Sequence, residues 1–249
     1  MYAHPPAPIL TVAVVGAEST GKTSLVAQLH ILAQQHSVVC DSVQEHLRDW
    51  VVQHKRTPQT HEQQGIAQAQ QQATQLAYNN LQHREPIETL APTAATAKPS
   101  HASGIRLLLL DTTAILTAAY SAHYFNDHSL WAQAFSSEPQ VDLYLLMGLD
   151  VAWQADGLQR DGEAARHSVD QQLRLALRTQ GLDYQVVYGQ GDNRTQAAWM
   201  AIQSALLACK DPSNKSPKGL AKTSPNFHAW GCEGCSDADC ERTLFKGLL

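Results

Sequence analysis

The stretch that decides the fold is ILTVAVVGAESTGKTSLVAQL, residues 9–29. Its opening run, Ile9–Val15, is almost entirely apolar and rich in β-branched residues, which is typical of a buried strand. From Lys22 onward, leucine and valine recur at helical spacing, which predicts a helix over Lys22–Gln35. The loop between them, GAESTGKT, matches the phosphate-binding pattern G-x-x-x-x-G-K-[ST] at every fixed position. A glycine turn that fits by chance is the alternative, and the flanking strand and helix argue against it.

This loop has the residue types that hold a nucleoside triphosphate with magnesium. Gly16 and Gly21 let the backbone curl so that its N–H groups point inward, and the N-terminus of the following helix adds partial positive charge. Lys22 supplies a cation for the β- and γ-phosphates, and the Thr23 hydroxyl is a ligand for Mg²⁺. We therefore expect ATP and Mg²⁺ as cofactors. The nucleotide-binding residues predicted from the loop are Gly16, Ala17, Glu18, Ser19, Thr20, Gly21, Lys22, Thr23 and Ser24.

Strand-like and helical patterns alternate along the rest of the chain. Further strands are predicted at residues 37–40, 105–110, 141–147 and 184–188, and further helices at 43–54, 60–83, 113–123, 164–180 and 195–209. Such an alternation gives a parallel sheet that is covered by helices on both faces. We therefore expect an α/β fold over residues 8–209, a three-layer sandwich with a mainly parallel five-stranded sheet.

Two regions interrupt or follow this domain. Residues 85–104 contain Pro, Ala, Thr and Ser without a period, which predicts a flexible insertion. Residues 210–226 are predicted to be a linker to a short Cys-rich C-terminal tail at 227–249. The candidate zinc ligands in that tail, by their spacing, are His228, Cys232, Cys235 and Cys240. A zinc site, an iron–sulfur centre and reduced thiols without metal all stay open, and the tail is also a candidate contact for a protein partner.

Composition limits the classes of partner. The chain has 249 residues and a formal net charge of −5, which argues against nucleic acid as the main partner. No segment approaches the roughly 20 apolar residues of a membrane span, and the first residues lack a secretory signal. We therefore expect a cytoplasmic protein that acts on a small molecule.

Two patches of acidic residues bear on phosphoryl transfer. Asp111 ends the apolar run IRLLLL, and a P-loop protein needs a carboxylate for Mg²⁺ at the end of such a strand. The alternative is that Asp111 caps the next helix. Glu45 and Arg48 are three residues apart on the predicted helix at 43–54, so they share a face and could orient an acceptor hydroxyl. The alternative for this pair is a surface ion pair.

Two arginine-bearing segments follow the later strands. The polar segment DVAWQADGLQRDGEAARHSV carries Arg160 and Arg166, and arginines in a lid at this place would neutralise charge on the γ-phosphate. A solvated loop with ordinary surface arginines is the alternative. Arg194, in GQGDNR, is a candidate for stacking on the adenine base.

The chain resembles the ribosylnicotinamide kinase domain of bacterial NadR-type proteins, P-loop NTPases that are sometimes grouped under an AAA-type label. The resemblance covers about Leu10–Leu207 and rests, in this order, on GAESTGKTSLVAQL, the E-x-x-R of EHLRDW, IAQAQ, LLLLDTT, WQADGLQR and YQVVYGQGDNR. Its most specific part is the W-x-x-D-G element, Trp153–Gly157, together with Glu45 and Arg48. The family commonly carries an arginine two residues after that glycine, where this chain has Gln159 followed by Arg160.

The resemblance implies a P-loop kinase-type sheet and a kinase that phosphorylates the ribose 5′-hydroxyl of nicotinamide riboside, giving nicotinamide mononucleotide. The catalytic residues it implies are Lys22, Glu45, Asp111, Arg160 and Arg166. The riboside-binding residues it implies are Glu45, Arg48, Trp153 and Asp156. A regulatory ATPase whose tail binds metal or a partner is the alternative, and a requirement for a nucleoside acceptor separates the two. The acidic charge weakens a third reading, a DNA-linked ATPase.

Overall fold

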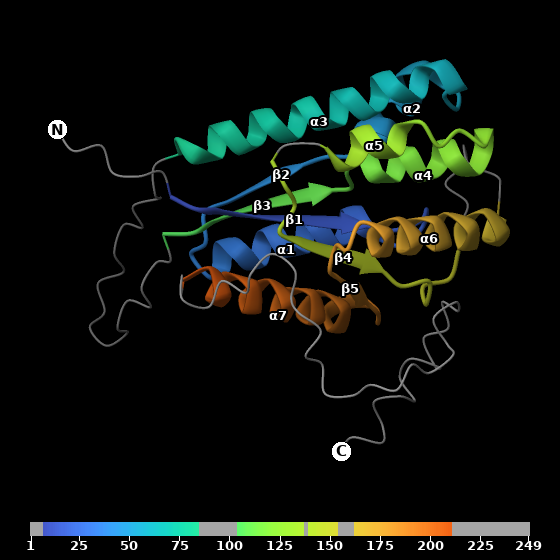
Figure 1. Cartoon of the computed structure of the whole chain (residues 1–249). Coiled ribbons are helices and arrows are strands. Elements are labelled where there is room, and N and C mark those ends of the chain that lie inside the picture. The colour runs from blue at the N-terminus through green and yellow to red at the C-terminus, as the bar shows by residue number, and fades with distance from the viewer. Residues whose placement is uncertain (1–6, 85–103, 137–138, 154–161, 211–249) are drawn as a thin grey trace, which may run out of the picture.

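Five strands of the described residues form one sheet in the order β2-β3-β1-β4-β5, and every neighbouring pair is parallel (Figure 1). The computed structural model describes residues 7–84, 104–136, 139–153 and 162–210. The strands are β1 Ile9–Val15, β2 Cys40–Val43, β3 Arg106–Asp111, β4 Leu143–Met147 and β5 Tyr184–Val187. The predicted α/β class and the five-stranded parallel sheet are confirmed.

Helices cover both faces of this sheet, so the domain has three layers (Figure 1). They are α1 Lys22–Gln35, α2 His46–His54, α3 Thr60–Gln82, α4 Ala114–Phe125, α5 Leu130–Phe135, α6 Gly162–Thr179 and α7 Gly191–Lys210. Helices α1 and α7 pack on one face, and α2 to α6 lie on the other. Among the described residues, no helix is both long enough and apolar enough to cross a membrane.

The alternation of side chains along β1 separates the two outer layers. Leu10, Val12 and Val14 are buried against α1 and α7, while Ala13 and Val15 are buried against the helices of the opposite face. A strand buried on both faces has no polar side to present, and this explains why β1 and β3 read as nearly continuous apolar runs.

The strand order places two sequence motifs next to each other. Strand β1 lies between β3 and β4, and Val14 of β1 pairs with Asp111 at the end of β3. The order of the strands reverses at β1, and in open parallel sheets ligands bind beside the carboxyl ends at such a point. The P-loop and Asp111 therefore share one edge of the sheet.

The predicted strand at 37–40 and the start of the helix at 43 are wrong by a few residues. Val38 belongs to the turn that ends α1, because Ser37 adopts a left-handed conformation with φ 55° and the Val38 N–H donates to the Ala33 carbonyl at 2.9 Å. The Val39 carbonyl accepts from the Leu107 N–H of β3 at 2.9 Å, so pairing with β3 starts at this residue. The strand follows at Cys40–Val43, paired with β3, and α2 begins only at His46.

Several predicted features lie outside the described residues. They are the insertion up to residue 103, the lid positions Asp156 and Arg160, the linker beyond Lys210, and the tail with His228, Cys232, Cys235 and Cys240. The zinc site therefore stays a prediction.

Candidate functional site

The P-loop connects β1 to α1 and leaves the start of α1 open. Gly21 adopts a left-handed conformation with φ 82°, which a residue with a Cβ rarely takes, and α1 begins at the next residue. The N-cap residue is this glycine, which has no side chain to cap the helix end. Its first N–H groups are therefore available to an anion, in the part of the helix where the macrodipole is positive.

Gly16 is required by a close approach. A Cβ at this position would lie 2.8 Å from Cβ of Met147, at the end of the neighbouring strand β4. That distance is shorter than packed carbon atoms allow, so one backbone would have to shift. The first glycine of the motif thus keeps the P-loop and β4 together.

We expect Gly16→Ala to lower the free energy of unfolding by about 1–3 kcal/mol, because the added methyl group overpacks the β1–β4 contact. Gly65→Ala is the matched control, since a Cβ at Gly65 meets nothing within 4 Å. In the interior of α3 that control should be neutral or stabilising by about 0.5–1 kcal/mol. Denaturant unfolding of both variants measures the difference; equal effects would contradict the role given to Gly16.

Lys22 lies over its own loop. The side chain is buried, and its Nζ donates to the Ala17 carbonyl at 3.0 Å. The Thr20 hydroxyl donates to the same carbonyl at 2.8 Å. Lys22 therefore closes the loop in this structure, and its ammonium group lies within the same turn that would surround phosphate oxygens.

Asp111 and Thr23 meet at the end of β3. The Thr23 hydroxyl donates to Oδ2 of Asp111 at 2.5 Å, and Asp111 is only 1% exposed. The other carboxylate oxygen, Oδ1, has no hydrogen-bond partner among the described residues. The alternative that Asp111 caps α4 is not supported, because the Thr113 hydroxyl accepts the hydrogen bond from the Ile115 N–H at that end.

These two oxygen-bearing side chains fit Mg²⁺. A buried carboxylate needs a hydrogen bond or a cation for each oxygen, and Mg²⁺ takes hard oxygen ligands. The described residues contain no cluster of three or more metal-binding side chains. Mg²⁺ in proteins commonly has one or two protein ligands and completes its shell with water and substrate phosphates. The pair Thr23 and Asp111 is sufficient for that arrangement.

Glu45 is the N-cap residue of α2, whereas the sequence predicted it to lie inside the helix. It is buried, at 8% exposed, and Arg48 Nη2 lies 3.5 Å from its Oε2. The Arg48 side chain is 58% exposed, so the buried carboxylate is the member that the protein positions. Strand β2 extends to Val43, and this pushes the start of the helix beyond Glu45.

Gln70 of α3 fixes the turn that carries Glu45. Its Oε1 accepts from the His46 N–H at 2.7 Å, and its Nε2 donates to the Gln44 carbonyl at 3.2 Å. Both ends of one buried carboxamide therefore hold the residues on either side of Glu45. Sequence reasoning found Gln70 only as part of the IAQAQ segment and gave it no role.

Arg166 is a buried guanidinium on α6. It is 2% exposed, and its Nε and Nη2 have no hydrogen-bond partner among the described residues. Burial lowers the pKa of Arg166 from its usual value, with opposing contributions from Glu163 and Asp150. An arginine held in this way is suited to an anionic ligand that would supply the missing acceptors.

Arg194 braces the P-loop from α7. Its Nη1 donates to the Thr20 carbonyl at 2.7 Å, and its Nη2 donates to Oδ1 of Asp150 at 2.6 Å. The other oxygen of Asp150 accepts from the Gly189 N–H at 2.7 Å. The structure therefore places Arg194 against the phosphate-binding loop, and stacking on adenine stays a prediction. Sequence reasoning missed Asp150.

Trp153 joins the segment after β4 to the same loop. Its indole N–H donates to Oε1 of Glu18, a weak contact at 3.4 Å. Glu18 is buried within the P-loop. Trp153, the one described member of the Trp153–Gly157 element, thus contacts the P-loop, as Arg194 does.

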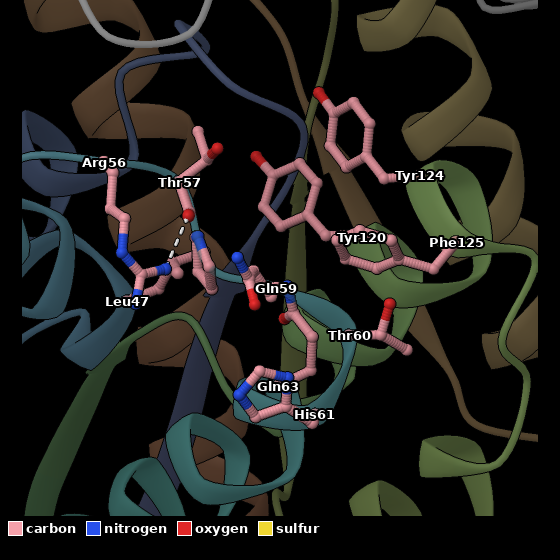
Figure 2. A pocket seen from close by; sticks show the side chains of 11 residues that line it. Leu47, Arg56, Thr57, Gln59, Thr60, His61, Gln63, Tyr120, Tyr124 and Phe125 are labelled. Carbon is pink, nitrogen blue, oxygen red and sulfur yellow. Dashed lines mark hydrogen bonds between the residues drawn. The ribbon is translucent and has the colours of Figure 1, made fainter.

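A cavity of about 1020 Å³ lies between the α2–α3 connection and α4. Figure 2 shows the side chains of that connection on one side, facing Tyr120, Tyr124 and Phe125 of α4 on the other. The rings of Tyr120 and Tyr124 are stacked, with centroids 5.9 Å apart. Leu47 of α2, two residues after Glu45, also lines the cavity, and the α4 residues come from the second half of the helix that follows Asp111.

Arg56, which lines this cavity, is neutralised by an ion pair with Glu62. Arg56 donates to both carboxylate oxygens of Glu62, at 2.7 and 2.6 Å. These hydrogen bonds are the main reason why the pKa of Glu62 falls to about 2. The ion pair therefore persists at neutral pH, and it leaves an uncharged, partly aromatic cavity wall.

Solved structures similar to this one include kinases. A crystal structure of NadR protein in complex with NR matches with a TM-score of 0.55 and 20% identity, covering 78% of this chain and 50% of that one. The chain thus spans half of the NadR chain. Thymidylate kinase from Ehrlichia chaffeensis matches with a TM-score of 0.50 and 11% identity, covering 80% of this chain and 99% of that one. At these identities the likeness shows the fold, which is the P-loop kinase fold.

Sequence comparison identifies the family. No curated protein sequence matches the chain. The profile of the AAA domain family matches residues 11–194, a range that runs from β1 through the P-loop and Asp111 to Arg194. The chain therefore belongs to the AAA domain family.

Proposed function

We propose that this protein is an ATP-dependent kinase that phosphorylates the 5′-hydroxyl of a nucleoside, with nicotinamide riboside as the preferred acceptor. The observation that carries the proposal is the hydrogen bond between Thr23 and the buried Asp111, which joins the P-loop to the end of β3. Helix α4, which follows Asp111, and Leu47 of α2, which follows Glu45, border a cavity of about 1020 Å³ together with the α2–α3 connection. A triphosphate site next to an acceptor-sized cavity is the minimum that a small-molecule kinase requires.

Each residue has a defined task in such a transfer. Bound magnesium ATP supplies the phosphoryl group and a cation that neutralises its charge. The N–H groups at the start of α1 hold phosphate oxygens, and Lys22 exchanges the Ala17 carbonyl for a phosphate oxygen. Thr23 and Asp111 hold the cation. Glu45 orients the acceptor hydroxyl and accepts its proton, and Arg166 offsets charge on the transferred group.

An acceptor without a phosphate group fits the cavity better than a nucleotide. The phosphate of a nucleoside monophosphate needs unpaired cationic side chains, whereas Arg56 already binds Glu62 with both terminal nitrogens. The wall formed by Tyr120 and Tyr124 suits a planar base. The nicotinamide ring of a riboside carries positive charge, and aromatic faces attract such a ring. The likeness to a NadR protein solved with NR is consistent with this choice.

The direct test is ATP consumption by the purified protein with nicotinamide riboside, with other nucleosides, or with no acceptor. Turnover that depends on a riboside and yields its 5′-phosphate supports the proposal. Turnover that is the same with and without every acceptor contradicts it and favours the regulatory ATPase. Preference for another nucleoside would keep the kinase and replace the acceptor.

Arg166→Met should separate activity from stability. The change removes a buried guanidinium with two unpartnered nitrogens, so the free energy of unfolding should stay equal or rise. We expect kcat to fall by about a hundredfold or more, because the transferred group loses a cation. Arg178→Met, at an exposed position of α6, is the control for both measurements. A stable, fully active Arg166→Met variant would remove Arg166 from the mechanism.

A further inference from the structure

One buried polar group in the cavity has no described partner. Gln63 of α3 lines the cavity and is 3% exposed, yet its Oε1 makes no hydrogen bond to any described residue. Figure 2 shows Gln63 among the side chains that line the wall opposite the tyrosines. Buried carboxamides are normally hydrogen-bonded, so this exception calls for an explanation.

Gln70, on the same helix, shows what a satisfied carboxamide looks like. Both of its ends are used, by the His46 N–H and by the Gln44 carbonyl. Gln63 has the same chemistry and nearly the same burial, but it borders a cavity and not a turn of backbone. A ligand in the cavity can therefore supply hydrogen bonds to Gln63, as the backbone supplies them to Gln70.

The chemistry of the cavity defines the group that would pair with Gln63. A carboxamide offers a donor and an acceptor side by side, and rotation about its last bond exchanges the two. Its complement is a planar group with an adjacent acceptor and donor. The primary carboxamide of nicotinamide has this pattern, and so do the amine and ring nitrogen of adenine or cytosine. The stacked rings of Tyr120 and Tyr124 would hold such a plane.

We infer that Gln63 determines base specificity by pairing with a donor–acceptor edge of the acceptor's base. This inference rests on the proposed function, since it assumes that the cavity holds the acceptor. It commits to one class of ligand, a riboside whose base carries an amide or an equivalent edge. A base without that edge would leave the buried carboxamide unpaired, and sites built to pair a polar group discriminate strongly against analogues that lack it.

The test is a binding cycle that uses two ligands and two proteins. Nicotinamide riboside and pyridinium riboside differ only in the carboxamide, and Gln63→Met removes the pairing group while it keeps the side-chain length. By calorimetry, we expect the wild type to bind nicotinamide riboside about 10- to 100-fold more tightly than pyridinium riboside. In Gln63→Met the two affinities should become nearly equal, with that for pyridinium riboside unchanged.

Two further variants guard against a merely structural effect. Gln64→Met alters the exposed neighbour on the same helix and should preserve the preference. Gln63→Glu keeps an acceptor oxygen of the same shape and should retain part of the preference that Gln63→Met loses. A loss of folding would weaken both ligands equally. Equal weakening of both ligands by a folded Gln63→Met protein, or no change in either, overturns the inference for nicotinamide riboside.

Adenosine and cytidine form the remaining arms of the test. If one of these shows the dependence on Gln63 and nicotinamide riboside does not, the inference stands and the proposed acceptor is wrong. Binding that depends on Gln63 without ATP-dependent phosphorylation leaves the inference intact and contradicts the kinase. Phosphorylation of nicotinamide riboside that does not change when Gln63 is replaced supports the kinase and contradicts the inference. If no riboside binds to the wild type, the inference is overturned.

Discussion

Lys22→Ala should abolish most ATP-dependent turnover, with kcat lower by at least about a hundredfold. The ammonium group of Lys22 is buried within the P-loop and donates to the Ala17 carbonyl, so it is already within the turn that would hold the phosphates. Alanine leaves the loop without a mobile cation at the point where negative charge develops. Single-turnover assays with saturating ATP separate this loss from weaker nucleotide binding.

The control for Lys22→Ala is the removal of a cation elsewhere. Lys55 is exposed at the end of α2 and has a left-handed φ of 52°, a conformation that asparagine tolerates. Lys55→Asn should therefore leave both turnover and folding nearly unchanged. Lys22→Ala protein that retains full turnover would mean that the P-loop is not the site of catalysis.

Asp111→Asn should raise the concentration of Mg²⁺ that half-saturates activity and should lower kcat by roughly a hundredfold. The asparagine oxygen can still accept the Thr23 hydrogen bond, so the fold should survive. Stability should fall little or even rise, because the buried charge with an unpartnered Oδ1 is removed. Titration of activity with Mg²⁺ and denaturant unfolding measure the two effects.

Asp183→Asn is the matched control for Asp111→Asn, because Asp183 is an exposed carboxylate just before β5. It should shift neither the Mg²⁺ dependence nor the unfolding curve. An Asp111→Asn variant with an unaltered Mg²⁺ requirement would place the cation elsewhere.

Residues that are close in the sequence could be predicted, because their signals are local. The strand, loop and helix at 9–35 carry their own apolar period and glycine pattern, and the structure has them at the expected bounds. Asp111 could also be found from the sequence. A fully buried strand appears as a short apolar run, and Asp111 is the first polar residue after the run IRLLLL. The helix α5, Leu130–Phe135, was missed because so short a segment shows no period.

The cavity could not be predicted, because its residues are ordinary when taken singly. Gln63 lies in a glutamine-rich helix, where nothing in the sequence separates a buried carboxamide from an exposed one. Tyr120 and Tyr124 look like the apolar stripe of a helix. Only the folding of the α2–α3 connection against α4 brings these segments together. The shift of β2 has a similar cause, since the turn that ends α1 uses Val38, one of the apolar residues that suggested a strand.

Helix α3 connects the residue proposed to recognise the base with the residue that holds Glu45 in place. At its N-terminal end Gln63 lines the cavity proposed for the acceptor, and further along Gln70 holds the turn that carries Glu45. A base that pairs with Gln63 and fixes the position of α3 would also fix the position of the Glu45 carboxylate. Acceptors with a truncated base should then lose kcat as well as affinity, because binding energy from a remote group is what aligns the reacting oxygen. Selectivity in the proposed kinase would then depend on how α3 aligns the acceptor hydroxyl with the transferred phosphoryl group.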